Sequence, residues 1–461
     1  MWRSPPMVIR VATDCSGMGI PEMGLEVLAM KNNFKTECVF MCDNAKPCQQ
    51  WLQNLELGGI IYIDMTTRIF DKKRQAIKGL TINGVNEVIS TKEKDLDLYL
   101  CGFPCTPFTP NGLRQGFDDV ASKPFWSCLK TIITLKPKVA ILENVTGLGK
   151  EDTKQVVEKS LSHLKGYVVV WLLMKTKDFG IPHDRERYYM ICFRAESLHE
   201  IFKGRSPDIL AAFIQEKTKS WKQKLNIDFM KWFEVNDVPV VPEVYRSDEP
   251  DFDGTCTCQN DKACKVHVCA CQICKREGAD KKKCTWRETH KLYINRKLKA
   301  IVQFRKLWRQ VKNDATLKSV PDYFEMARKR GVSTRMLQKP RERCILKTIS
   351  KHCNLLRPCS ILNLDKTIHR CSVRQNGLVP CLGYSCTGFY LPAAGTYLTV
   401  PQLLKLTGMN ENLPNNWFEK ACQVSKHQIS LMIGNAMTLP VVTSLTSAAL
   451  SMTSLKSMPS M

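Results

Sequence analysis

The sequence predicts an α/β protein built on a doubly wound, mostly parallel sheet, with a second, smaller cysteine-rich domain. Short apolar stretches alternate with amphipathic ones from residue 7 to residue 194, which is the pattern of strands that alternate with helices. The apolar stretches are nearly continuous, as expected for parallel strands that are buried on both faces. After residue 194 the alternation fades, and a dense cysteine cluster near residue 255 indicates a second domain.

Six strands are expected in the first region. Five of them read VIRVATD, ECVFMCD, LDLYLCGF, KVAILENV and YVVVWLLM, at residues 8–14, 37–43, 96–103, 138–145 and 167–174. The sixth lies within residues 179–193 and places Arg185 and Arg187 on one face, because side chains two residues apart in a strand point the same way. Open α/β sheets bind ligands at the carboxyl ends of their strands, so functional residues are expected directly after these stretches.

Local patterns predict the remaining elements. Residues 290–313 carry apolar side chains at mostly three- to four-residue spacing among many Lys and Arg, which predicts an amphipathic helix. Its basic face either contacts a polyanion or is a solvated surface. Near the end of the chain, Gly434 and Asn435 precede a helix-like segment. The Ser- and Met-rich residues 451–461 are expected to form a frayed tail.

Composition limits the classes of function. The chain of 461 residues has 68 Lys and Arg against 44 Asp and Glu, and a formal net charge of +24. Residues 275–345 hold 22 Lys or Arg against 7 Asp or Glu, so most of the excess lies in one segment and indicates a polyanionic partner such as nucleic acid. No apolar run approaches the roughly 18 residues that cross a bilayer. We expect a soluble intracellular protein whose 22 cysteines are thiols or metal ligands.

Four short segments carry the residues from which chemistry is expected. GFPCTPF places Cys105 in a Pro-flanked loop directly after a strand, where a nucleophile is expected. KVAILENVTGL delivers Glu143 and Asn144 at the carboxyl end of the next strand. The third segment holds Arg185 and Arg187, and the fourth is ISLMIGNAMTLP near the C-terminus. In this order and spacing, the four segments resemble the motifs of the cytosine-C5 DNA methyltransferase family.

The resemblance covers residues 8–194 and about 396–450, and it implies a domain organisation. Residues 1–195 are then a Rossmann-like methyltransferase core that binds S-adenosylmethionine. Residues 196–395 are a target-recognition region, and residues 396–461 return to the catalytic core. The implied reaction transfers a methyl group from S-adenosylmethionine to C5 of cytosine.

The implied chemistry assigns a role to each motif residue. Addition of a thiolate to C6 turns the pyrimidine into an enamine whose C5 accepts a methyl group, and Cys105 is assigned to that attack. Because the addition places electron density on N3 and O2, Glu143 is assigned to N3 and Arg187 to O2. Arg185 is expected to hold a phosphate or the active-site loop, and Asn144 to brace the site through its amide. The alternative for the charged residues is a structural buried ion-pair network.

The segment TDCSGMGIPEMGLE resembles the family's first loop, which surrounds S-adenosylmethionine. Gly17 and Gly19 are expected to let the backbone approach the cofactor. The segment departs from the family pattern at Thr13, Cys15 and Ile20, which replace an acidic, an aromatic and a glycine residue.

Three polar residues are expected to complete the cofactor site. Asp43 is assigned to the ribose hydroxyls, Asp64 to the adenine amino group, and Asn435 to a contact from the C-terminal helix. Each aspartate has the alternative of capping a helix. In the segment GTYLTVPQLLKLTGMNEN, which resembles an element supporting the recognition region, Gln402 stands where the family has an acid.

Residues 256–284 form a dense cluster of metal-ligand residues, CTCQNDKACKVHVCACQICKREGADKKKC. The C-x-C pairs and the spacing predict one or two structural zinc sites. The expected ligands, with the histidine optional, are Cys256, Cys258, Cys264, His267, Cys269, Cys271, Cys274 and Cys284. The alternative is a cluster of reduced free thiols. Zinc is expected to fold this segment and to present the basic stretch 275–345 to phosphate.

Together these observations predict a DNA (cytosine-5-)-methyltransferase that uses S-adenosylmethionine, contains zinc and acts as a monomer on double-stranded DNA. Its expected location is the nucleus in a eukaryote, and otherwise the cytoplasm or nucleoid. Two alternatives stay open. One is a tRNA cytosine-C5 methyltransferase of the same fold, and the other is a catalytically silent DNA-binding protein, to which Thr106 in place of the family's Gln gives some weight.

Overall fold

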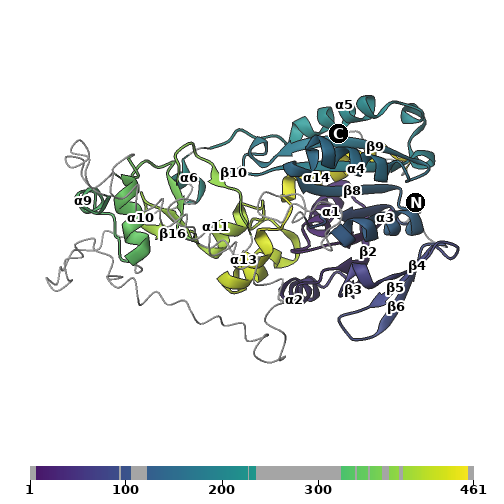
Figure 1. The fold of residues 1–461 in the computed structure, drawn as a ribbon, viewed down its shortest axis with the longest axis horizontal. Coiled ribbons are helices and arrows are strands. Elements are labelled where there is room, and N and C mark those ends of the chain that lie inside the picture. Colours follow the sequence, from purple (N-terminus) through teal and green to yellow (C-terminus); the bar gives the residue numbers. More distant parts are fainter. Residues whose placement is uncertain are drawn as a thin grey trace, which may run out of the picture. The chain divides into compact units, whose positions relative to one another are not determined.

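Figure 1 shows the computed structural model of the chain. It describes residues 7–92, 95–104, 122–226, 228–234, 323–337, 340–350, 354–365, 373–383 and 388–454. The chain divides into two compact units. Unit 1 consists of residues 1–233, 376–387 and 398–461, and unit 2 consists of residues 234–375 and 388–397.

The centre of unit 1 is a seven-stranded sheet in the order β3-β2-β1-β7-β8-β11-β9. Its strands are β1 (Val8–Asp14), β2 (Lys35–Cys42), β3 (Ile60–Tyr62), β7 (Leu98–Cys101), β8 (Val139–Val145), β9 (Tyr167–Lys175) and β11 (Glu186–Arg194). The pairs from β3 to β8 are parallel, whereas β11 is antiparallel to both of its neighbours. The predicted α/β fold with a mostly parallel sheet is confirmed. Strand order reverses between β1 and β7, which is the position where such sheets bind ligands.

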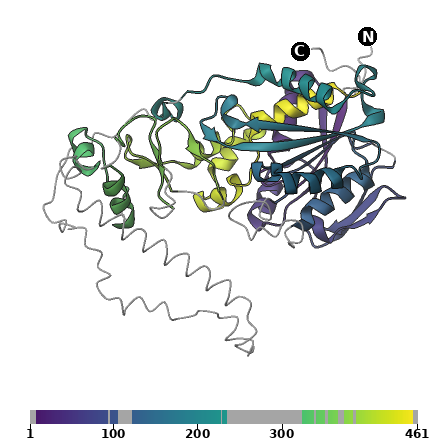
Figure 2. The same cartoon turned by 45° about the horizontal axis from the view of Figure 1, so that its top comes forward.

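Helices cover both faces of this sheet (Figure 2). One face carries α3 (Lys123–Leu135) and α4 (Glu151–Leu161), and the other carries α1 (Ile20–Asn32), α5 (Pro207–Thr218) and α14 (Leu439–Ser451). Phe125 and Ile132 of α3 pack with Tyr99 and Leu142 of the sheet in one continuous core. On the other face α1 and α14 approach closely, since a Cβ on Gly24 would lie 2.5 Å from Thr443 Oγ1. The C-terminal helix is therefore an integral part of the core.

Shorter elements complete unit 1. They are α2 (Lys46–Asn54), β10 (His183–Asp184), α6 (Phe229–Trp232), β14 (Val379–Pro380), α11 (Val400–Lys405), α12 (Trp417–Cys422) and α13 (Lys426–Ile433). The helix expected after Gly434 and Asn435 is present as α14. The frayed tail was predicted to start too early: Met452 is buried and Thr453 forms a β-bridge with Leu198, because apolar contacts with the core continue past the end of α14.

A three-stranded antiparallel sheet follows β3 and was not predicted. It consists of β4 (Ile69–Asp71), β5 (Ala76–Leu80) and β6 (Asn86–Ser90). Its apolar side chains are interspersed with charged ones, and the strands are short, so the sequence shows no clear strand period there. Ile77 nevertheless lies in the core beside Tyr62 and anchors the small sheet to unit 1.

The described part of unit 2 contains two helices and a small antiparallel sheet in the order β13-β12-β15-β16. The elements are α9 (Tyr323–Lys329), α10 (Pro340–Ser350), β12 (Ile361–Asn363), β13 (Val373–Arg374), β15 (Phe389–Leu391) and β16 (Thr396–Tyr397). Tyr323 and Tyr390 are buried together, with their hydroxyl oxygens 3.0 Å apart. The predicted helix 290–313 and the cysteine cluster lie outside the described residues. Across the described ranges, no helix has the length and apolar character needed to span a membrane.

Candidate active site

A buried carboxylate between two arginines forms the charged centre of the site. Glu143 lies near the carboxyl end of β8 and is only 5% exposed. Its Oε1 is 3.2 Å from Arg187 Nε and 3.6 Å from Arg185 Nη2. The antiparallel pairing of β8 with β11 brings these groups together from positions about 40 residues apart in sequence. Two guanidinium groups facing one carboxylate leave this cluster with an excess of positive charge.

The prediction that Arg185 lies on a regular strand is wrong. The residue lies at the break between β10 and β11. At this break its N–H donates to His183 O at 2.9 Å, and its carbonyl accepts from Thr176 N. The side chain is 3% exposed, and its Nη1 donates to Gly434 O at 3.2 Å. The short turn closed by the hydrogen bond from Arg185 N to His183 O separates β10 from β11. The side chain of Arg185 connects the turn after α13 to Glu143.

Asn144, next to Glu143, contacts the loop that leads to Cys105. Its Nδ2 donates to Phe103 O at 3.0 Å, and its Oδ1 accepts from Val145 N at 2.8 Å. Gly102 brings this loop close to the carboxylate, because a Cβ there would lie 3.4 Å from Glu143 Oε2. Cys105 itself lies outside the described residues, which end at residue 104 and resume at residue 122.

A thiol that was not predicted faces the same two arginines. Cys381 is exposed, and its Sγ lies 3.6 Å from Arg187 Nη2 and 3.9 Å from Arg185 Nη1. Partial desolvation of the sulfur by its neighbours raises the pKa of this thiol, but the two guanidinium groups outweigh that effect and hold the pKa below its ordinary value. The pair Pro380-Cys381 carries no local signal, because its meaning depends on a contact with residues almost 200 positions away.

The loop between β1 and α1 has the backbone expected of a ligand-binding turn. Cys15, Gly17 and Gly19 have φ values of 51°, 54° and 69°. Glycine adopts this left-handed conformation without steric cost, whereas Cys15 adopts it despite its side chain. The N–H of Gly17 donates to Asp43 Oδ2 at 2.9 Å, so the loop is fastened to the end of β2.

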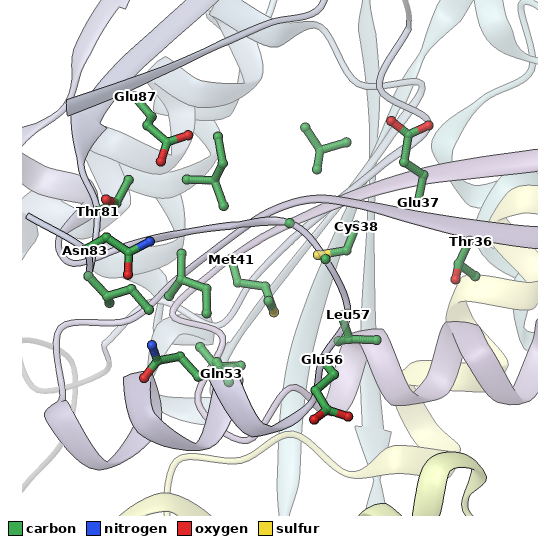
Figure 3. A pocket seen from close by; sticks show the side chains of 17 residues that line it. Thr36, Glu37, Cys38, Met41, Gln53, Glu56, Leu57, Thr81, Asn83 and Glu87 are labelled. Atoms are coloured by element: carbon green, nitrogen blue, oxygen red, sulfur yellow. The ribbon is translucent and has the colours of Figure 1, made fainter. Parts of the chain in front are cut away.

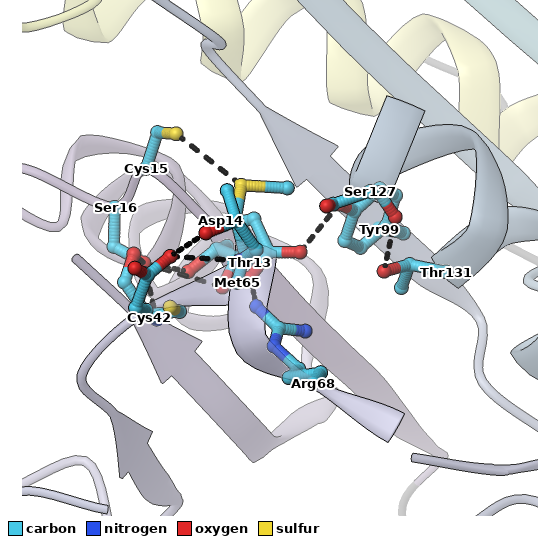
Figure 4. Close-up of polar contacts among 12 residues, drawn as sticks. Thr13, Asp14, Cys15, Ser16, Cys42, Met65, Arg68, Tyr99, Ser127 and Thr131 are labelled. Carbon is cyan, nitrogen blue, oxygen red and sulfur yellow. Dashed lines mark hydrogen bonds and ion pairs between the residues drawn. The ribbon is translucent and has the colours of Figure 1, made fainter. Parts of the chain in front are cut away.

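A buried ion pair lies at the base of this loop (Figure 4). Asp14, the last residue of β1, pairs with Arg68, and both side chains are fully buried. Tyr99 Oη donates to the other carboxylate oxygen at 2.6 Å. The guanidinium carbon also lies 5.1 Å from the ring centroids of Phe40 and Tyr62, within the range of cation–π attraction. These contacts fix the end of β1 from which the loop starts.

An acidic residue approaches the loop from α1. Glu22 is buried and accepts a hydrogen bond from Thr13 Oγ1, which also lies 2.6 Å from Ser16 Oγ. Burial raises the pKa of Glu22 to about 7. Its Oε2 is buried and has no hydrogen-bond partner within the described part of the chain. Thus Thr13 stands where the resemblance predicts an acid, and the carboxyl group of Glu22 from the following helix contacts it instead.

The other predicted cofactor residues have separate local contacts. Asp43 Oδ1 accepts from Ala45 N at 2.9 Å, and burial raises the pKa of the Asp43 carboxyl. Asp64 Oδ1 accepts from Thr66 N at 2.7 Å and caps a single 3₁₀ turn, which is the alternative use considered for it. Asn435 is exposed in the turn between α13 and α14.

A cavity of about 790 Å³ lies beside β2 and β3, away from the site (Figure 3). Its lining includes Thr36 and Cys38 of β2, Gln53 of α2, and Asn83 and Glu87 near the small sheet. Neither Asp43 nor Asp64 belongs to its lining. This cavity is therefore distinct from the ligand-binding edge at the carboxyl ends of the strands.

The predicted metal ligands of residues 256–284 lie outside the described residues. Within the described ranges, no group of three or more His, Cys, Asp or Glu residues is arranged to hold a metal ion. Ten cysteines of those ranges are free thiols.

Comparison with known proteins gives a family and several partial relatives. A family model described as C-5 cytosine-specific DNA methylase matches residues 11–451. The chain is similar to the Type II methyltransferase M.NlaX of Neisseria lactamica, with 36% identity over 131 residues, which are 27% of this chain and 42% of the relative. With M.Bsp6I of Bacillus sp. (strain RFL6), identity is 35% over 142 residues, which are 30% of this chain and 45% of the relative.

A third relative is also similar to this chain over only part of its length. The Type II methyltransferase M.HhaI of Haemophilus parahaemolyticus is 34% identical over 125 residues, which are 26% of this chain and 38% of the relative. The chain therefore covers less than half of the length of each of these three relatives.

Proposed function

Because the chain belongs to the C-5 cytosine-specific DNA methylase family, we propose that it transfers a methyl group from S-adenosylmethionine to C5 of cytosine in double-stranded DNA. The observation that carries this proposal is the position of Glu143 between Arg185 and Arg187, beside the loop that leads to Cys105. A site for this reaction needs an acid and a cation at adjacent edges of one pyrimidine ring. In this cluster the carboxylate of Glu143 and the guanidinium of Arg187 lie 3.2 Å apart.

In the proposed reaction, Cys105 attacks C6 of the flipped-out cytosine and a sulfur–carbon bond forms. The electron pair of the C5–C6 double bond moves into the ring, where Glu143 at N3 and Arg187 at O2 stabilise it. Methyl transfer to C5, removal of the C5 proton and elimination of the thiolate then restore the aromatic ring. Arg185 is buried and bound to Gly434, so we assign it to holding the turn after α13 and the orientation of Glu143.

The loop after β1 suits S-adenosylmethionine, which supplies an electrophilic methyl group when bound. Gly17 holds the backbone in a left-handed turn, and a Cβ there would meet no atom closer than 3.9 Å, so the loop leaves room for a ligand at this position. Gly19 is also left-handed, but a Cβ there would collide with Leu55, so its role is close packing against α2. We assign Asp43 and Asp64, at the carboxyl ends of neighbouring strands, to the ribose hydroxyls and the adenine amino group, and Asn435 to a contact from the C-terminal side. A carboxylate is a suitable acceptor for hydroxyl and amino donors.

For the recognition region we propose one or two structural zinc ions bound within residues 256–284, and phosphate contacts from the basic stretch 275–345. Support comes from the cysteine spacing and the concentration of positive charge in the sequence. Metal analysis of the purified full chain is expected to give one or two zinc ions per chain. A metal-free preparation that binds DNA with full affinity and the usual salt dependence would contradict this part.

The direct test of the proposed function uses labelled S-adenosylmethionine with duplex DNA and with tRNA in parallel. We expect incorporation into duplex DNA, with 5-methylcytosine as the product after hydrolysis and mass spectrometry. Incorporation into tRNA alone would establish the RNA alternative. No incorporation into either, together with tight DNA binding, would establish the silent DNA-binding alternative.

A further inference from the structure

The backbone holds Cys381 in a defined position against the arginine pair. β14 pairs in parallel with β10, and Val379 N donates to Pro182 O at 2.7 Å. On the other side of the cysteine, Leu382 N donates to His183 Nε2 at 3.0 Å. Hydrogen bonds on both sides of Cys381 therefore restrict where its side chain can lie.

His183 is the buried acceptor on which this arrangement depends. Its Nδ1 lies 3.1 Å from Leu406 O, so the ring donates through Nδ1 and accepts through Nε2 as a neutral imidazole. Burial and the nearby Arg185 lower the pKa of His183 to about 3, so the ring stays neutral at physiological pH. His183 thus fixes the Cys381 segment without adding charge to the site.

The charges around Cys381 favour its thiolate. From the β10–β11 segment, Arg185 and Arg187 face the sulfur at 3.9 and 3.6 Å. From β8, Glu143 balances one of these two cations. Arg185 is 4% exposed, and its Nε is buried without a hydrogen-bond partner in the part of the chain that the structure describes. Among the residues that the structure describes here, two guanidinium groups thus share the single carboxylate of Glu143, and an anionic sulfur at Cys381 would add a second negative charge beside them.

Several other cysteines of the described ranges differ from Cys381 in exposure and in the charges around them. Cys381 alone among these ten thiols is exposed. Buried Cys101 and Cys128 have thiol pKa values raised above the ordinary value by desolvation. Cys422 is partly exposed, but burial raises its thiol pKa and carboxylates of Glu419 and Glu411 add to that effect. Cys422 is therefore a matched internal reference for Cys381.

We propose that Cys381 is a modification site: a thiolate held by Arg185 and Arg187 at the edge of the Glu143 site, which hydroperoxides oxidise to a sulfenic acid. The sulfur attacks one peroxide oxygen and forms an S–O bond while the O–O bond breaks. Sulfur loses two electrons, the peroxide is reduced, and the departing oxygen leaves as hydroxide or alkoxide and takes a proton from water. The thiolate is the reactive form, so the arginine pair is the cause of the reactivity.

The reactivity is tested on the full chain without DNA or cofactor. Iodoacetamide is added in limiting amount at several pH values, and alkylation of each cysteine is followed by peptide mass spectrometry. We expect Cys381 to react at least about ten-fold faster than Cys422 near pH 7, with a rate midpoint at a lower pH. Hydrogen peroxide followed by dimedone is expected to label Cys381 before Cys422. Equal rates and equal labelling of the two would overturn the proposal.

Two arginine variants separate the electrostatic cause from simple exposure. Arg187→Gln removes one cation beside the sulfur and is expected to slow alkylation of Cys381 several-fold. Arg194→Gln, at the other end of β11 and paired with Asp95, is the control and is expected to leave the rate unchanged. If Arg187→Gln does not fold, the pH profile of the parent protein alone decides. A Cys381 rate midpoint at or above that of Cys422 would overturn the proposal.

One consequence rests on the proposed function, namely that sulfenylation beside Arg187 inhibits methyl transfer. We expect peroxide to lower methyl transfer less in Cys381→Ser than in the parent, and Cys422→Ser to behave as the parent. If Cys381 is oxidised as expected while methyl transfer is unaffected, the inhibitory role is overturned and the modification site stands. If no methyl transfer is found at all, the proposed function fails, yet the labelling experiment still decides the reactivity.

Discussion

The loop after β1 and the Glu143 cluster, the two halves of the proposed site, are built in different ways. The loop departs from the family pattern at Thr13, Cys15 and Ile20, yet it keeps the left-handed turn at its glycines. The buried ion pair of Asp14 and Arg68 holds the end of β1 from which the loop starts. A loop supported in this way tolerates changes in the side chains that line it.

The Glu143 cluster shows the opposite pattern. Glu143, Asn144, Arg185 and Arg187 all match the family motifs. The geometry of the cluster, however, depends on partners that lie far away in the sequence. Arg185 binds the carbonyl of Gly434, and both arginines face Cys381. The comparison shows that the motif residues are specified by the local sequence. Their geometry is set instead by segments that meet only in the folded chain.

The largest effect is expected from breaking the support of the loop. Asp14→Asn leaves Arg68 buried without its counter-ion, and we expect a loss of about 3–5 kcal/mol in the free energy of unfolding. The control is Asp71→Asn, because Asp71 and its partner Arg74 have side chains that are 44% and 84% exposed. For this variant we expect a loss of less than about 1 kcal/mol in the free energy of unfolding. Urea unfolding measures both. Similar small losses for the two variants would show that the buried pair does not support the loop.

The next effect tests the cluster. Glu143→Gln keeps the shape of the side chain but removes its charge, and methyl transfer is expected to fall by about 10²–10³-fold while DNA affinity changes little. Glu186→Gln is the control, since that carboxylate is 34% exposed and pairs with Lys175 away from the cluster. Single-turnover rates and binding isotherms separate the two quantities. Equal losses in rate and affinity for Glu143→Gln would assign it a structural role.

A smaller, pH-dependent effect concerns the acid that approaches the loop. Folding raises the pKa of Glu22 from 4.5 to about 7, so the folded state holds more protons between these values and stability falls as pH rises through them. The loss amounts to about 3 kcal/mol at most. Glu22→Gln stays neutral and is expected to flatten this dependence, whereas Glu158→Gln, at an exposed position on α4, is not. Parallel pH profiles for Glu22→Gln and the parent would contradict the buried neutral carboxyl.

Most of the sheet could be predicted because buried parallel strands are nearly continuous apolar runs. The strands that end at Asp14, Cys101 and Val145 all occupy the positions that this pattern indicates, or positions within a residue or two of them. The small sheet of β4, β5 and β6 was missed because its strands are short and mix charged with apolar residues. The break at Arg185 was missed because the alternation of side chains along a strand does not reveal where the strand is interrupted.

Within the site, the sequence predicted which residues carry the charged groups, but not which residues from other elements contact them. Glu143 and Arg187 follow from local motifs, and the structure places them 3.2 Å apart. The roles of Glu22, His183 and Cys381 depend on contacts between different elements, and no local pattern specifies such contacts. Glu22 is a case in point, since a glutamate in the first turn of a helix is ordinarily interpreted as a helix-dipole partner rather than a buried acid.

The central claim is that cytosine is attacked by Cys105 beside the Glu143 cluster. The most direct measurement uses duplex DNA that carries 5-fluorocytosine, which blocks the elimination step and traps the covalent complex. We predict a denaturation-resistant complex with S-adenosylmethionine for the parent protein and for Cys381→Ser, and none for Cys105→Ala. A complex that persists in Cys105→Ala and disappears in Cys381→Ser would contradict this assignment and transfer the nucleophile to the other thiol.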